Sequence, residues 1–102
     1  MGAPIVEVMT TEVLNDPTLN RYELLVDGEH AGATDYLIRD NTLTFIHTEI
    51  DPAREGEGLG GELARGALNL VRADTDYRVR ATCPFMKAYL EKHPEFEDLL
   101  TR

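Results

Sequence analysis

A short glycine-rich stretch between a strand-like segment and a helix-like segment constrains the fold of this chain more than any other feature. Residues 43–50, before the stretch, alternate with the two-residue side-chain period of a strand. Residues 59–71, at its end, repeat apolar side chains at helical spacing. The stretch itself contains Gly56, Gly58, Gly60 and Gly61. A strand that passes through such a loop into an amphipathic helix is typical of a crossover, which predicts an α/β fold.

The remaining segments predict a mixed sheet that is mostly antiparallel at first and gains a parallel pair across the long central helix. Asp27-Gly28 lies between two β-leaning segments and is a strong hairpin signal. Pro84 favours the start of a C-terminal helix, because proline is preferred in a helix's first turn, and His93-Pro94 ends that helix. Strands are predicted near residues 5–9, 21–26, 31–38, 43–50 and 77–82, with turns at 15–17 and 40–41.

The size and charge of the chain limit its domain organisation and its partners. A length of 102 residues allows one hydrophobic core, so residues 1–102 are expected to form a single domain. The net charge of −9 disfavours nucleic acid and anionic membranes as partners and favours cationic ones. We expect a cytoplasmic location, because no run approaches the roughly 18 apolar residues of a membrane helix and no secretory signal is recognisable. Neither the single cysteine nor the spacing of the histidines predicts a metal site.

The glycine-rich loop has the features of an anion-binding site. Backbone N–H groups at the start of a helix lie at the positive end of the helix dipole and lack intrahelical acceptors. Glycines allow the backbone to approach an anion closely and to adopt positive φ angles. Glycines near a helix start are also common as plain turn residues, so the loop alone leaves both interpretations open.

Four motifs, in order along the chain, favour the anion-binding interpretation of the glycine-rich loop over a plain turn. They are His47-Thr48-Glu49, Gly56-Glu57-Gly58-Leu59-Gly60, Cys83-Pro84-Phe85 and His93-Pro94-Glu95-Phe96. Their order and spacing over residues 22–100 resemble the small GNAT-like N-acetyltransferases, which consist of little beyond an acetyl-CoA-binding core. The pyrophosphate loop of that superfamily reads R/Q-x-x-G-x-G/A. Here Gly58 and Gly60 match its glycines, whereas Glu55 stands at the Arg/Gln position, beside Arg54.

The resemblance implies a set of residues that bind acetyl-CoA. The backbone of Glu57, Gly58, Leu59, Gly60 and Gly61 is expected to hold the pyrophosphate. The strand that ends at Ile50 is expected to diverge from the strand at 77–82 and to offer exposed backbone to the pantetheine arm. Lys87 is a candidate for the remaining phosphate, although a lysine on an amphipathic helix is commonly part of the solvated face.

Cys83 is the first candidate for the chemistry of acetyl transfer. It is predicted at the N-cap of a helix, where the dipole and free N–H groups favour a thiolate. Such a cysteine could accept the acetyl group covalently or protonate the departing coenzyme thiolate, and in this small family the matching cysteine is a suspected nucleophile. A buried structural cysteine is the alternative.

His47 and Glu49 are the candidate bases that remove a proton from the incoming ammonium group, through water. Their two-residue spacing predicts that they point the same way from their strand, on a face that also carries Leu43 and Phe45. A hydrogen-bonded structural histidine and a solvated glutamate are the alternatives. His93 is expected to stop a helix and is a further residue to test.

The function expected from these features is acetyl-CoA-dependent N-acetyl transfer, with acetyl-CoA as co-substrate and no metal. The acceptor is an unidentified amine, either a small molecule or a lysine or N-terminus of a protein. The alternative is a module that binds CoA or acetyl-CoA without turnover and acts as a ligand-gated interaction protein, since so short a chain leaves few residues for an acceptor pocket. The oligomeric state stays open.

Overall fold

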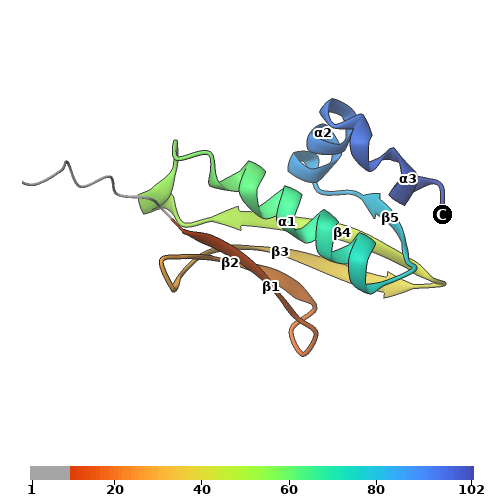
Figure 1. Ribbon diagram of the computed structural model, residues 1–102, viewed down its shortest axis with the longest axis horizontal. Coiled ribbons are helices and arrows are strands. Elements are labelled where there is room, and N and C mark those ends of the chain that lie inside the picture. The colour runs from red at the N-terminus through yellow and green to blue at the C-terminus, as the bar shows by residue number, and fades with distance from the viewer. Residues whose placement is uncertain (1–9) are drawn as a thin grey trace, which may run out of the picture.

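The computed structural model describes residues 10–102, which form one five-stranded sheet with helices packed on it (Figure 1). The strands are β1 (Thr11–Asp16), β2 (Arg21–Val26), β3 (Glu29–Arg39), β4 (Thr42–Ile50) and β5 (Arg78–Ala81). The helices are η1 (Pro52–Arg54), α1 (Leu59–Asp74), α2 (Pro84–Lys92), η2 (Pro94–Phe96) and α3 (Glu97–Leu100).

The order of the sheet is β1-β2-β3-β4-β5, with antiparallel pairing from β1 to β4 and parallel pairing between β4 and β5. Because α1 connects the two parallel strands, the predicted crossover and the mixed α/β fold are confirmed. The strand predicted at residues 5–9 lies outside the described residues. The first described strand, β1, includes Asn15 and Asp16, so the turn predicted at residues 15–17 is wrong in position and lies at residues 17–20.

Two tight turns set the register of the antiparallel strands. The turn between β2 and β3 consists of Asp27 and Gly28, whose φ angles are 50° and 84°. The turn between β3 and β4 consists of Asp40 and Asn41, with φ angles of 50° and 58°. Two consecutive residues with positive φ match the twist of a hairpin, and Asp, Asn and Gly tolerate this conformation best. The predicted hairpin is confirmed, and β3 begins at Glu29 because the turn needs only two residues.

A β-bulge at Ile46 corrects one expectation about the strand β4. Tyr36 of β3 pairs with Phe45, whereas the adjacent Asp35 pairs with His47, so Ile46 is an extra residue in β4. An extra residue shifts the alternation of side chains by one position. His47 therefore does not share the buried face of Phe45, and the prediction of a common face for Leu43, Phe45, His47 and Glu49 is wrong.

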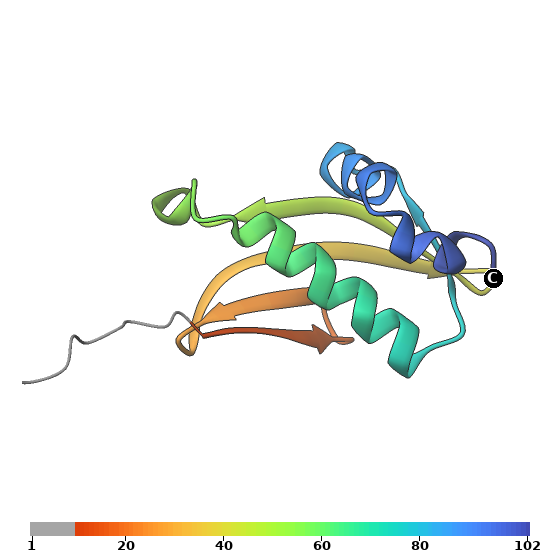
Figure 2. The ribbon, with the colours of Figure 1, turned by 45° about the horizontal axis from the view of Figure 1, so that its top comes forward.

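The core lies between the sheet and the helices, which cover one face of the sheet. Side chains of α1, α2 and α3 belong to the same buried cluster as alternate residues of β2, β3 and β4. Figure 2 shows α1 lying along the sheet with α2 and α3 beside it. The buried residues of α1 are Leu59, Leu63, Ala64, Ala67, Leu68 and Val71. The helical spacing of apolar residues predicted over residues 59–71 is confirmed, and Leu70 within this range is only partly buried.

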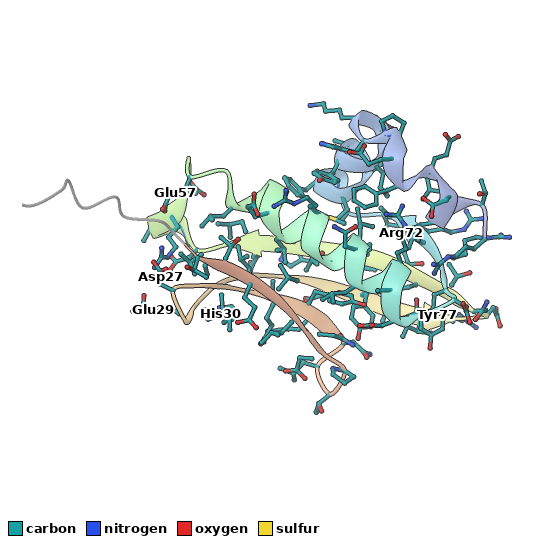
Figure 3. The ribbon with its side chains drawn as sticks, in the orientation of Figure 1. Asp27, Glu29, His30, Glu57, Arg72 and Tyr77 are labelled. Carbon is teal, nitrogen blue, oxygen red and sulfur yellow. The ribbon has the colours of Figure 1, made fainter. Side chains whose placement is uncertain are left out.

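The last helix is held to α1 by polar contacts in addition to its apolar side chains. Arg72 of α1 donates from Nε to Asp98 at 3.1 Å and from Nη2 to the carbonyl of Glu95 at 2.7 Å. Its guanidinium also lies 5.0 Å from the ring centre of Phe96. Arg102 donates to the carbonyl oxygens of Thr75 and Tyr77 at 2.8 and 3.2 Å. Figure 3 shows Arg72 between α1 and this C-terminal segment.

Candidate functional site

The start of α1 presents backbone N–H groups without acceptors in the helix. Gly58 is the N-cap residue, with a φ of 75°, a left-handed conformation that favours glycine. Its carbonyl accepts the N–H of Glu62 at 3.4 Å. The N–H groups of Leu59, Gly60 and Gly61 precede this first helical bond, and no side chain of residues 10–102 caps the helix. These donors lie at the positive end of the α1 dipole, which is a favourable place for an anion.

The first turn of α1 touches the start of α2 on one side and is open on another. A Cβ atom added to Gly60 would lie 2.8 Å from Cζ of Phe85, so this glycine allows close contact with the Cys83-Pro84-Phe85 motif. A Cβ atom added to Gly61 would meet no atom of the described residues within 4 Å. The structure therefore brings two of the sequence motifs together and leaves open space above the first turn of α1.

Few positive charges accompany the glycine loop. Glu55 and Glu57 are exposed, and Arg54 bonds through Nη2 to Oε2 of Glu29 at 3.2 Å. Figure 3 shows Glu57 at the end of the molecule that also carries Asp27 and Glu29, far from Tyr77. Neutral N–H groups, more than side-chain cations, are thus the donors that this loop offers to an anion.

The parallel strands β4 and β5 separate beside the glycine loop, as the resemblance implied. Their pairing runs from Thr42 with Arg78 to Phe45 with Ala81. The N–H groups of Thr82 and Cys83 both donate to the carbonyl of Phe45, at 3.0 and 3.2 Å. The chain then turns into α2, and residues 46–50 of β4 continue past the last paired residue of β5. Among the strands of residues 10–102, none therefore pairs with residues 46–50 on the edge of β4 that faces β5.

Cys83 lies at the point where the two strands separate, at the N-cap of α2 as predicted. Its side chain is buried, with 5% of the residue exposed. Sγ donates to Oγ1 of Thr48 at 3.3 Å, and Thr48 shares a hydrogen bond of 2.9 Å with Oγ1 of Thr34, which is fully buried. Sequence reasoning missed both threonines, because nothing in the sequence marks them as hydrogen-bonded neighbours of the thiol.

His47 and Glu49 lie on the face of the sheet opposite to Cys83. Nε2 of His47 is 3.3 Å from Oε1 of Glu49, and the side chains are 58% and 78% exposed. Thr48, between them in the sequence, points to the other face and meets Cys83. The two sets of candidates thus flank the same short stretch of β4 from opposite faces.

Lys87 and His93 lie apart from the glycine loop. Lys87 is exposed and borders a small hollow with Ala81, Leu90, Glu91 and Leu100. The ring of His93 stacks on Tyr89 at 3.8 Å, and its Nδ1 atom lies 2.8 Å from the carbonyl of Tyr89. His93 ends α2 in this way, in agreement with its predicted place at the helix stop.

Comparison with known families agrees with this geometry. A family model described as GCN5-related N-acetyl-transferase matches residues 21–99, from the first residue of β2 into α3. Comparison with curated proteins gave no match. Among residues 10–102, no helix has the length and apolar character needed to cross a membrane, and no three acidic, histidine or cysteine side chains gather as metal ligands. The matched span contains the diverging strands, the glycine loop and the helix that follows it, and the chain therefore belongs to the GCN5-related N-acetyltransferase family.

Proposed function

We propose that the protein transfers the acetyl group of acetyl-CoA to a primary amine. The observation that carries this proposal is the uncapped start of α1 beside the free edge of β4, in a chain of the acetyltransferase family. A diphosphate needs several N–H donors that converge on one point, and a pantetheine arm needs unpaired strand backbone. The loop at residues 57–61 and the end of β4 offer both.

The residues of the loop fit a diphosphate group. The backbone of Glu57, Gly58, Leu59, Gly60 and Gly61 would hold the two phosphates, and the open space at Gly61 leaves room for their approach. Ile50, at the end of β4, would supply backbone contacts to the pantetheine arm. Lys87 would meet a phosphate only at the edge of the ligand, since it borders a separate hollow.

Acetyl-CoA supplies an activated acetyl group, and the protein would orient it and manage two protons. The acceptor nitrogen forms a bond to the acetyl carbon while the carbon–sulfur bond breaks and leaves its electron pair on sulfur. Cys83 is proposed to give its S–H proton to that sulfur. His47 or Glu49 accepts, through water, the proton that the ammonium group loses before attack. The nitrogen loses a second proton to solvent after the new bond forms, and Cys83 regains a proton from solvent. The products are an acetamide, free CoA and one proton.

Calorimetry and a CoA-release assay test this proposal together. Binding of CoA and release of free CoA in the presence of an amine panel are both expected. Cys83→Ser is expected to lower kcat by about 10²–10⁴-fold, the usual contribution of a positioned acid, while the dissociation constant for CoA stays unchanged. Asp76→Asn, an exposed change on the α1–β5 connection, serves as the matched control.

Two outcomes contradict the proposal at different points. Failure of wild-type protein to bind CoA at millimolar concentration rejects the function. Detection of acetylated Cys83 by mass spectrometry, with acetyl-CoA and no amine, rejects direct transfer and assigns the covalent route.

A further inference from the structure

The face of the sheet opposite α1 contains a hollow of about 360 Å³. This volume is at the lower end of the range of about 300–1,000 Å³ that is usual for small-molecule pockets. The residues of the hollow that matter here are Arg21, Ala33, Asp35, His47, Glu49 and Asp51. His30, which Figure 3 labels, lies at its border. None of the three α-helices covers this face, because their buried side chains all belong to the core on the other side.

Small side chains and two bulges produce this hollow. Ala31, Gly32 and Ala33 of β3 line it, but Ala31 is fully buried in the core, so Ala33 is the small side chain at the floor of the hollow. A Cβ atom added to Gly32 would lie 2.6 Å from the carbonyl oxygen of Glu49, so the two strands approach closely only because this residue is glycine. The register shifts at Ala31 in β3 and at Ile46 in β4, and such bulges bend a sheet and re-aim its side chains. A bent sheet with the small side chain of Ala33 on this face leaves space for a small ligand.

The charges around the hollow favour a cation. Three carboxylates border it, from Asp35, Glu49 and Asp51, against a single guanidinium from Arg21. Nε of Arg21 lies 3.3 Å from Oδ1 of Asp35, so these two charges largely offset each other. Within residues 10–102, Glu49 and Asp51 have no guanidinium partner; Glu49 meets Nε2 of His47 at 3.3 Å, and Oδ1 of Asp51 accepts the N–H of Ala53 at 3.0 Å. The net charge of the chain is −9 with neutral histidines. An alkylammonium group matches this pattern, because its methylenes can lie on the methyl group of Ala33 while its charge meets a carboxylate.

The hollow and the proposed acetyl site share the strand β4. The hollow borders one face of β4, and the acetyl site is at the edge of β4 that faces β5. In the described part of the chain, no strand pairs with residues 46–50 of β4 on the side that faces β5. Along this stretch Thr48 meets the thiol of Cys83 on the core face, whereas His47 and Glu49 border the hollow on the opposite face. An amine held in the hollow would therefore reach an acetyl group on this edge of β4 without crossing the core.

We propose that the hollow binds the acceptor and that the acceptor is an aliphatic primary amine with a second positive charge, an alkyl diamine. One ammonium group meets Asp51 at the end of β4, and the reacting amine lies beside Glu49 and His47. This inference rests on the proposed acetyl transfer and adds the class of the acceptor. A lysine side chain is also an aliphatic primary amine, so experiment decides whether the acceptor is a free diamine or a lysine of a peptide.

The test is calorimetry of the whole protein saturated with CoA, with two probes in separate titrations. The probes are 1,4-diaminobutane and a tripeptide with a central lysine and blocked ends. Ala33→Leu fills the floor of the hollow and leaves every charge in place, and it is expected to weaken binding of the diamine by at least about tenfold. Glu49→Gln removes one carboxylate and is expected to weaken binding by about tenfold. Asp76→Asn removes the same charge outside the hollow and is expected to change little.

The outcomes separate this inference from the function on which it rests. Diamine binding that both hollow variants weaken supports the inference, and tighter binding of the lysine tripeptide would overturn the diamine in favour of a peptide acceptor. No binding of either probe to a protein that binds CoA overturns the hollow as the acceptor site and leaves acetyl transfer intact. Diamine binding that Ala33→Leu leaves unchanged, if the variant keeps its circular dichroism spectrum, has the same meaning. Failure of the wild-type protein to bind CoA instead rejects the proposed function.

Discussion

At the scale of single residues, the hydroxyl groups of Thr48 and Thr34, next to Cys83, are expected to affect both the stability of the fold and acetyl transfer. Thr48 accepts the thiol hydrogen bond and shares a second hydrogen bond with the fully buried Thr34. A buried hydroxyl without a partner carries a desolvation cost of about 1–3 kcal/mol. Thr48 therefore fixes the position of the thiol and also satisfies Thr34.

Thr48→Val tests this arrangement, because valine keeps the shape of threonine and removes the hydroxyl. We expect the free energy of unfolding, measured in urea, to fall by about 1–2 kcal/mol as Thr34 loses its partner. We also expect kcat for acetyl transfer to fall about tenfold, with the dissociation constant for CoA unchanged, because the thiol is less well oriented. Thr48→Ser, which keeps the hydroxyl, is the control. Equal losses in both variants would show that the methyl group, and not the hydrogen bond, matters.

At the scale of elements, β4 shows what the sequence could and could not predict. The alternation over residues 43–50 predicted a strand, and the following glycines predicted the start of α1, since both are local patterns. The bulge at Ile46 depends on how β3 pairs with β4, which no local pattern encodes. His47 was therefore predicted on the wrong face, and neither the Thr34–Thr48–Cys83 hydrogen bonds nor the outer hollow was predicted.

In the helix α1, Gly61 is expected to lower stability and to favour CoA binding, and Gly61→Ala tests both effects. Glycine inside a helix costs about 0.5–1 kcal/mol relative to alanine, and an added Cβ would meet nothing here. We expect the variant to raise the free energy of unfolding by about this amount and to weaken CoA binding, because the new methyl group occupies the approach to the N–H groups. Thermal unfolding and calorimetry measure the two effects. Asn69→Ala, on the exposed side of the same helix, is expected to leave CoA binding unchanged, and a Gly61→Ala variant that behaves the same way contradicts the assigned role of Gly61.

The docking of α3 on α1 is expected to depend on pH through Asp98. Hydrogen bonds from Arg72 hold the pKa of the Asp98 carboxyl below its ordinary value. The folded state thus favours the carboxylate, so the ion pair stabilises the fold above the ordinary pKa of about 3.9, and this stabilisation is lost as the pH falls through the lowered value. Asp98→Asn should lower the urea midpoint at pH 7, and the difference from wild type should shrink as the pH falls below the ordinary pKa of the carboxyl group. A difference that stays constant as the pH is lowered through this range and further would mean that the ion pair is not its source.

At the scale of the whole molecule, topology was more predictable than the arrangement of the site. The hairpin at Asp27-Gly28, the crossover through α1 and the position of Cys83 at the N-cap of α2 all follow from turn residues, helical periodicity and proline. The Arg72 and Arg102 contacts that fasten the C-terminal segment join residues more than twenty positions apart, and the sequence gives no sign of them. A two-layer molecule results, with one face of the sheet beneath the helices and the other carrying the hollow.

The central claim is that bare amides at the start of α1 bind a diphosphate. The most direct measurement is a titration of the ¹⁵N-labelled protein with CoA, followed through its amide proton–nitrogen spectrum. The account predicts the largest shifts at the N–H groups of Leu59, Gly60 and Gly61, with smaller shifts along residues 46–50 of β4. Saturable shifts confined to other parts of the molecule, or unchanged amide signals at millimolar CoA, would contradict it.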